Sequence, residues 1–235
     1  MLGILTLDTA FPRIRGDLGS AETFEFPVRH AIVEGAFVEE IVDRRNAALL
    51  RPFIVAARRL VAEGCIGITT TCGFLAAWQV ELAQHCEVPL LTSALLQLPL
   101  VQATLPAGKR VGVVTYSARD LDGAVLRAAN APVDTPVAGL DPESYFCRTI
   151  RRGSATLDRA QMGADTIETA RRLVADHHNV GAIVLECANM PPYRDAVAAA
   201  TGLPVYDAAQ LVDWFYAGLH ATSHALRTRA KLAIE

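Results

Sequence analysis

Short apolar runs rich in β-branched residues alternate along the chain with longer segments in which apolar positions recur every three or four residues. The runs predict strands at residues 2–8, 67–71, 89–92, 110–117, 133–140, 181–186 and 204–206. The longer segments predict helices at residues 44–63, 74–85, 94–105, 121–129, 157–177, 191–200 and from 208 to the end. Regular alternation of the two is typical of an α/β fold with mainly parallel sheets flanked by helices.

The segment after the first strand has neither period and is rich in Pro, Gly and charged residues. We expect residues 11–30 to form a long loop, and loops of this length inside a compact domain are usually functional or mobile. Two interpretations stay open. The loop is either a surface excursion or subunit contact, or a lid that places Arg13, Arg15 or Arg29 near an anionic ligand.

Two stretches repeat the same order of features, which is an apolar run followed by a cysteine and then by the start of a helix. The first contains Cys72 and the second contains Cys187. In each case a proline, Pro89 or Pro204, lies seventeen residues after the cysteine and opens another short apolar run. The chain is therefore predicted to be internally duplicated into two domains.

The predicted crossing between the domains is Pro106-Ala107-Gly108, which lies between a helix and a strand. The last helix is amphipathic, and duplicated folds often exchange their last helix, so we expect it to pack back on the first half. The expected domains are residues 1–105 plus 208–235 and residues 106–207. The active site is expected in the cleft between them.

Composition limits the classes of protein to consider. Of the 235 residues 51% are hydrophobic, which is ample for buried cores, and the formal net charge is only -3. No run of Lys or Arg is longer than a pair, so nucleic acid is not an expected partner. The apolar N-terminus has no basic region and reaches Asp8 early, and no apolar run approaches the ~20 residues of a membrane span. We therefore expect no membrane contact and a cytoplasmic location.

The cysteines fall into two groups. Five cysteines without a C-x-x-C pair fit a reducing compartment better than a disulfide framework, and metal-ligand spacing is absent. Cys65, Cys86 and Cys147 are interpreted as small buried hydrophobes. Cys72 and Cys187 each lie at a strand end and in the first turn of a helix, where free N–H groups and the helix dipole stabilise a thiolate. We expect their thiol pKa values to be lowered from about 8.5 towards 3.5 to 7.5.

Two such thiols in duplicated positions suggest a symmetric reaction. One cysteine, as a thiolate, removes a proton from a carbon beside a carboxyl group, and the other, as a thiol, returns a proton to the opposite face. The developing enolate needs hydrogen-bond donors. The candidates are the hydroxyls of Thr70, Thr71, Thr115 and Ser117 and the amides of Gly73, Phe74, Ala188 and Asn189. Ligands bind at the carboxyl ends of parallel strands. One cleft is therefore expected to receive Cys72, Cys187, Thr9, Thr115 and Ser117.

These residues give the chain a resemblance to the aspartate/glutamate racemase superfamily, which also holds hydantoin racemases, maleate isomerases and arylmalonate decarboxylases. The resemblance covers nearly the whole chain. It is carried by Leu7-Asp8-Thr9 with Phe11-Pro12-Arg13, by residues 69–74, by residues 112–117 and by residues 185–193. It implies two pseudo-symmetric Rossmann-like domains, with Cys72 and Cys187 as one catalytic cysteine from each. It also implies racemisation or isomerisation of a small carboxylate, an amino acid or derivative, without pyridoxal phosphate or any other cofactor. Relatives are commonly oligomeric, so a homo-oligomer stays open.

The chain departs from the family beside both cysteines. Amino-acid racemases of the family tend to have Asn-Thr after the first cysteine and Thr after the second, where this chain has Gly73-Phe74 and Ala188. These positions help hold the amino and carboxyl groups of the substrate in relatives. Aspartate or glutamate is therefore not the expected substrate, and Phe74 permits a more apolar one. Glu186 replaces a Gly that is common before the second cysteine, and we interpret it as a charge at the start of a helix or between strands, not as a third acid.

Other functions can be compared with racemisation on the same residues. The presence of both cysteines argues against the decarboxylase branch, which works with one. A maleate-type cis–trans isomerase with a cysteine nucleophile is compatible with the same residues, and so is a non-catalytic ligand-binding protein on the same scaffold. A cysteine hydrolase would need a histidine partner, and the histidines of the predicted helices show no sign of pairing. A dinucleotide site is not supported, because G-x-G-x-x-G is missing after both first strands.

Overall fold

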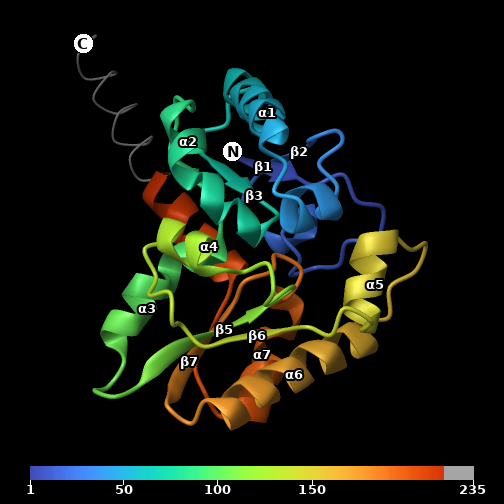
Figure 1. Cartoon of the computed structure of the whole chain (residues 1–235). Coiled ribbons are helices and arrows are strands. Elements are labelled where there is room, and N and C mark those ends of the chain that lie inside the picture. The colour runs from blue at the N-terminus through green and yellow to red at the C-terminus, as the bar shows by residue number, and fades with distance from the viewer. Residues whose placement is uncertain (220–235) are drawn as a thin grey trace.

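Two four-stranded parallel sheets form the framework of the computed structural model, which describes residues 1–219 (Figure 1). The first sheet has the strand order β2-β1-β3-β4 and the second has the order β6-β5-β7-β8. The strands are β1 (Leu2–Thr6), β2 (Val28–Ile32), β3 (Ile68–Thr70), β4 (Leu90–Leu91), β5 (Arg110–Thr115), β6 (Val137–Gly139), β7 (Val180–Leu185) and β8 (Val205–Tyr206). Both sheets follow the same order relative to the chain, which confirms the predicted α/β fold with two pseudo-symmetric Rossmann-like halves.

Helices flank both sheets, with α1 and α2 beside the first and α6 and α7 beside the second in Figure 1. Their bounds are α1 (Leu50–Ala62), α2 (Gln79–Gln84), α3 (Leu98–Thr104), α4 (Gly123–Ala128), α5 (Tyr145–Arg152), α6 (Arg159–Asp176) and α7 (Arg194–Thr201). Short 3-10 segments occur at Ala21–Thr23, Ala47–Leu49, Gly73–Trp78, Ala94–Gln97 and Pro191–Tyr193, and a π-helical turn spans Glu39–Asp43. Among the helices of residues 1–219, none combines the length and the apolar composition needed to cross a membrane.

The central strands carry the core because they are covered on both faces. All five residues of β1 are buried, as are five of the six residues in each of β5 and β7. Near-continuous apolar runs are typical of parallel strands buried on both faces. This signal is the reason why the sequence located these three strands to within two residues.

The predicted loop at residues 11–30 is wrong at its end, because β2 begins at Val28. This strand lies at the edge of the first sheet and pairs in parallel with β1, with Val28 opposite Leu2. Only Ala31 of the strand is buried, so the segment lacks the apolar run of the central strands. Its conformation is decided by pairing with β1, which the local sequence does not reveal.

Both cysteines directly follow a strand, but neither lies in the first turn of an α-helix as expected. Cys72 has extended backbone angles, φ -139° and ψ 114°, and precedes the 3-10 segment Gly73–Trp78, so that α2 starts only at Gln79. Cys187 is followed by a turn and by a second 3-10 segment before α7 begins. The two cysteines thus keep equivalent positions, whereas the α-helices begin later than predicted.

Residues 208–219 are helical and pack on the first half of the chain. The ring of Tyr216 stacks on Phe26 with 3.8 Å between the ring centroids. Leu219 closes over Gly67, where an added Cβ would lie 2.2 Å from Leu219 Cδ1. These contacts agree with the expectation that the last helix returns to the first half, while the domain boundaries stay a prediction. The remainder of the predicted helix lies outside the described residues.

Candidate active site

The duplicated fold brings the two cysteines into one buried centre between the sheets. Cys72 follows β3 and Cys187 follows β7, which are equivalent strands of the two sheets. The two residues are 7% and 9% exposed, and they are close enough for a charge on Cys72 to raise the pKa of Cys187. The fold therefore places the two predicted catalytic residues together, and their catalytic role stays a prediction.

The expectation of lowered thiol pKa values is wrong for both cysteines. Burial raises the pKa of Cys72 to about 12, and the nearby carboxylate of Glu186 adds to the rise. The pKa of Cys187 is raised by burial and then by Glu186, while the amide of Asn189 lowers it. Desolvation and a neighbouring negative charge both disfavour a thiolate, and here they outweigh the amide donors at the start of each turn. Both thiols are therefore harder to ionise in this centre than in water.

Glu186 lies in the same centre and is only 1% exposed. Its Oε2 atom accepts hydrogen bonds from Thr115 Oγ1 at 2.9 Å and from the amide of Tyr116 at 3.3 Å, and the amide of Gly73 also faces the carboxyl group. Burial raises the pKa of Glu186 to about 7, although these hydrogen bonds lower it. These bonds to the end of β5, the neighbour of β7, agree with the interpretation of Glu186 as a charge between strands. Glu186 is a third ionisable group between the two cysteine loops.

Gly73 provides the space that this carboxyl group occupies. An added Cβ at Gly73 would lie 2.0 Å from Glu186 Oε1 and 2.7 Å from Glu186 Cδ. Gly73 does not have a positive φ, so space and not backbone conformation requires a glycine here. The sequence did contain a signal for this pair, because the chain departs from the family at both positions. The structure shows that the two departures are spatial neighbours.

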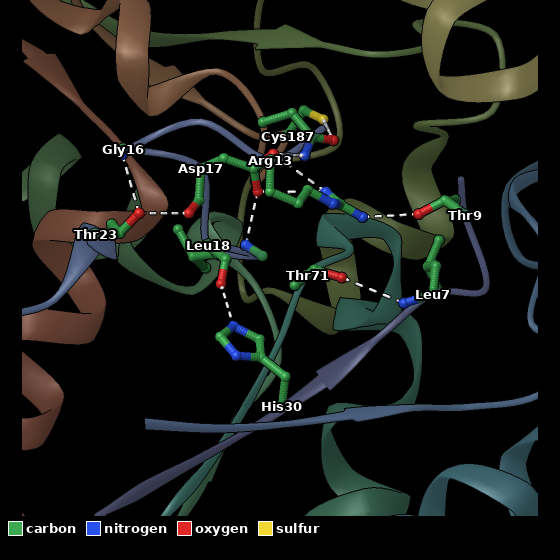
Figure 2. A network of polar contacts seen from close by, with 12 residues as sticks. Leu7, Thr9, Arg13, Gly16, Asp17, Leu18, Thr23, His30, Thr71 and Cys187 are labelled. Carbon is green, nitrogen blue, oxygen red and sulfur yellow. Dashed lines mark hydrogen bonds and ion pairs between the residues drawn. The ribbon is translucent and has the colours of Figure 1, made fainter. Parts of the chain in front are cut away.

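The N-terminal loop covers the second cysteine loop, as Figure 2 shows. The amide of Leu18 donates to the carbonyl of Ala188 at 3.1 Å, and Asn189 Nδ2 donates to Asp17 Oδ2 at 2.7 Å. The thiol of Cys187 in turn donates to Asn189 Oδ1 at 3.5 Å. The loop therefore contacts the candidate site, as the lid interpretation requires, while its opening stays a prediction.

Asp17 fixes the conformation of the covering loop from inside (Figure 2). It is 2% exposed, and its carboxylate accepts hydrogen bonds from the amide of Gly19 at 2.7 Å and from Arg13 Nη1 at 3.2 Å. Arg13 also donates to Thr9 Oγ1 at 2.7 Å and lies 4.0 Å from the centroid of the Phe11 ring. The negative charge of Asp17 is thus balanced within the loop.

The other two arginines of the loop segment are directed to the surface. Arg15 pairs with Glu25 at 3.0 Å and Arg29 pairs with Glu63 at 2.7 Å, and both arginines are more than half exposed. Of the three arginines considered from the sequence, only Arg13 lies beside the cysteine centre.

The hydroxyl groups of Thr70 and Thr71 form hydrogen bonds with backbone groups of the first half. Thr70 Oγ1 donates to the carbonyl of Thr92 at 2.6 Å and accepts from the amide of Cys72 at 3.3 Å. Thr71 Oγ1 accepts from the amide of Leu7 at 3.3 Å. These bonds fix the first cysteine loop to the neighbouring segments of the sheet.

The expected single cleft is divided in this structure. Ser117 lines a cavity of about 670 Å³, and Thr9 lines another of about 220 Å³, with Arg151 at the edge of both. Neither cavity is lined by a cysteine of the pair. Thr115 joins the cysteine centre through its hydrogen bond to Glu186, and Thr9 is linked to it through Arg13, while the shared cleft stays a prediction for Thr9 and Ser117.

The remaining cysteines lie outside this centre. Cys65 and Cys147 are buried, Cys86 is half-buried, and all are free thiols. In the part of the chain that the structure describes, no three His, Cys, Asp or Glu side chains gather in a way that could hold a metal ion.

The family of the chain follows from comparison with known proteins. A family model described as Asp/Glu/Hydantoin racemase matches residues 94–213, just over half of the chain, and the chain belongs to this family. Two curated relatives are each 29% identical to it. The dimethylsulfoniopropionate lyase of Durusdinium sp. clade D matches over 92% of this chain and 74% of its own length. Dimethylsulfoniopropionate lyase 5 of Emiliania huxleyi matches over 92% of this chain but only 44% of its own length.

Solved structures of the same fold have lower sequence identity. Arylmalonate decarboxylase has a TM-score of 0.61 at 15% identity, covering 92% of both chains. Allantoin racemase from Klebsiella pneumoniae has a TM-score of 0.62 at 17% identity, covering 92% of this chain and 88% of that one. Family and fold together support an enzyme that acts on a small carboxylate. They do not fix the isomerase class, because the curated relatives are named lyases.

Proposed function

We propose that the chain is an enzyme that removes the proton beside the carboxyl group of a small carboxylate, with Cys72 and Cys187 as its acid–base pair. The observation that carries this proposal is the equivalent placement of two cysteines in one buried centre of a duplicated fold. A racemase and a β-eliminating lyase share this first step, because each forms an enolate-like carbanion at the same carbon. They differ in what happens next.

Elimination from dimethylsulfoniopropionate is the first reaction to test, because relatives that align over nearly the whole chain carry this activity in their names. In this reaction a cysteine thiolate takes the proton from the carbon beside the carboxylate. The electron pair of that C–H bond forms the carbon–carbon double bond, and the bond from the next carbon to sulfur breaks. Dimethyl sulfide and acrylate leave, and the proton on the cysteine passes to solvent. The second cysteine, as a thiol, is available as a hydrogen-bond donor to the enolate.

Racemisation is the second candidate, and the duplicated position of the two thiols favours it. Here the second cysteine returns a proton to the opposite face of the same carbon. In either reaction we assign the amides of Phe74 and Asn189, which face the two thiols, to the stabilisation of negative charge at the centre. We assign Thr70 and Thr71 a supporting role, because their hydroxyls are already bonded to the backbone.

Proton NMR in deuterium oxide tests both candidates. Dimethylsulfoniopropionate should give the vinyl signals of acrylate if the chain is a lyase. Amino acids, hydantoins and substituted malonates should lose the α-proton signal without further change if it is a racemase, and maleate should give fumarate if it is a cis–trans isomerase. Cys72→Ala and Cys187→Ala should abolish the activity found, while Cys65→Ala, a buried cysteine outside the centre, should keep it. Binding of a ligand without turnover of any of these compounds would rule out the enzyme.

A further inference from the structure

The carboxyl group of Glu186 has no opposite charge beside it. Within residues 1–219 no Lys, Arg or His forms an ion pair with Glu186, and the groups that contact it are neutral donors, one hydroxyl and two amides. Asp17, the other acid that acts on Cys187, differs because Arg13 pairs with it at 3.2 Å. Buried charges in proteins are normally paired. Glu186 is therefore the unbalanced acid of the centre.

This imbalance conflicts with the chemistry proposed for the centre. The proposed reaction needs a thiolate and the carboxylate of the substrate in the same buried space, and Glu186 would add a third negative charge. Glu186 already opposes ionisation of Cys72 and of Cys187. At an effective dielectric constant of about 20, unit charges roughly 6 Å apart still change an equilibrium by about 100-fold. A positive charge brought by the substrate would remove this conflict.

We propose that Glu186 is the counter-charge for a substrate that carries a fixed cation as well as a carboxylate. The hydrogen bonds of Glu186 indicate which cation. A carboxylate has about four acceptor sites, and one hydroxyl and two amides already face this one. About one site is left, which is too few for an ammonium group with several N–H bonds to satisfy, so Glu186 is better suited to a cation without N–H groups, such as a sulfonium or a quaternary ammonium. The inference rests on the proposed function for the carboxylate part of the substrate, and the sulfonium of dimethylsulfoniopropionate belongs to the same class.

The test compares two ligands of the same shape and different charge. In 3-(trimethylammonio)propionate the quaternary nitrogen carries a positive charge, and in 4,4-dimethylpentanoate a carbon replaces it. Affinities are measured by isothermal titration calorimetry at about pH 8, where Glu186 is ionised. The wild-type protein should bind the cationic ligand at least about tenfold more tightly than the neutral one. β-Alanine, whose ammonium group needs hydrogen-bond acceptors, should bind less tightly than the quaternary ligand.

Glu186→Gln should reduce the preference for the cationic ligand to within about twofold, while the neutral ligand should bind at least as well as before. Cys65→Ala is the control, because this buried cysteine lies outside the centre and its loss leaves the carboxyl group of Glu186 and its hydrogen bonds in place. This variant should keep the preference. An unchanged preference in Glu186→Gln, or an equal affinity of the wild type for both ligands, would overturn the inference.

A measurement on the wild type alone covers the case that Glu186→Gln does not fold. The preference for the cationic ligand should weaken between about pH 8 and pH 6 as Glu186 takes up a proton. The other titratable thiols at the centre, Cys72 and Cys187, have pKa values raised well above this range, and Asp17 forms an ion pair with Arg13. A charge preference without turnover of any substrate would support this inference and reject the proposed enzyme. Turnover of a substrate, together with a preference for the cationic ligand that changes neither with pH nor in Glu186→Gln, would support the proposed enzyme and reject this inference.

Discussion

Replacing Gly73 by Ala should displace the carboxyl group of Glu186. The added Cβ would lie 2.0 Å from Oε1, 2.7 Å from Cδ and 2.8 Å from Cγ of Glu186. The carboxyl group cannot move away cheaply, because it is buried and bonded to Thr115 and Tyr116. Overpacking of this kind costs about 1–3 kcal/mol, and a lost hydrogen bond to a buried charged group adds about 1–2 kcal/mol. We expect Gly73→Ala to lower the free energy of unfolding by about 2–5 kcal/mol.

A double-mutant cycle measured by urea denaturation isolates this contact. Glu186→Ala removes the group that the new methyl would meet, so Gly73→Ala should cost little when it is added to that variant. The expected coupling energy is about 2 kcal/mol, at the upper part of the range for residues in contact. Gly218→Ala is the control, because an added Cβ there meets nothing within 4 Å. It should change stability by less than about 1 kcal/mol. If the losses in free energy of unfolding caused by Gly73→Ala and Glu186→Ala simply add in the double variant, the contact between the two positions is refuted.

Three further predictions concern the same centre. Because burial raises the pKa of Glu186 from 4.5 to about 7, the folded state holds this proton more tightly than the unfolded state. The free energy of unfolding is therefore measured for the wild type and for Glu186→Gln. The wild type should lose up to about 3 kcal/mol relative to the variant as the pH rises from about 4.5 to 7. A difference between the two proteins that does not change with pH would contradict the raised pKa. Iodoacetamide labelling followed by peptide mass spectrometry should modify Cys86 first, since the other four cysteines are buried, and fast labelling of Cys72 or Cys187 would contradict their raised pKa values. Asn189→Ala removes the hydrogen bond to Asp17 of the covering loop. It should lower the free energy of unfolding by about 1–3 kcal/mol and speed the labelling of Cys187. An unchanged labelling rate would show that this hydrogen bond does not hold the loop over Cys187.

The architecture could be predicted where the sequence carries a strong local signal. The strands β1, β5 and β7 are buried on both faces and have continuous apolar runs, and the repeated order of run, cysteine and proline indicated the duplication. The edge strand β2 could not be found in this way, because four of its five residues are at least partly exposed and only its pairing with β1 makes it a strand. The sequence likewise predicts the first turns of α-helices at both places where a 3-10 segment follows a cysteine.

The candidate site could be located from the sequence, but its electrostatics could not. The positions of Cys72 and Cys187 follow from the repeat. The direction of their pKa shifts depends on burial and on the carboxylate of Glu186, which are properties of the folded centre. Gly73 and Glu186 are far apart in the chain, and each looks like an isolated departure until the structure places one against the other.

The contacts around the two cysteine loops also bear on how the protein could have diverged after duplication. Glu186 from the second half fills the space beside Gly73 of the first half, and Asp17 from the first half bonds to Asn189 of the second. Each half therefore supplies a part that the other half lacks, and the two copies are no longer interchangeable modules. A chimera that takes its second half from a relative with glycine in place of Glu186 would leave a hole beside Gly73 and lose the central charge. Substitutions that redirect such a protein to a new substrate must consequently be made in both halves together.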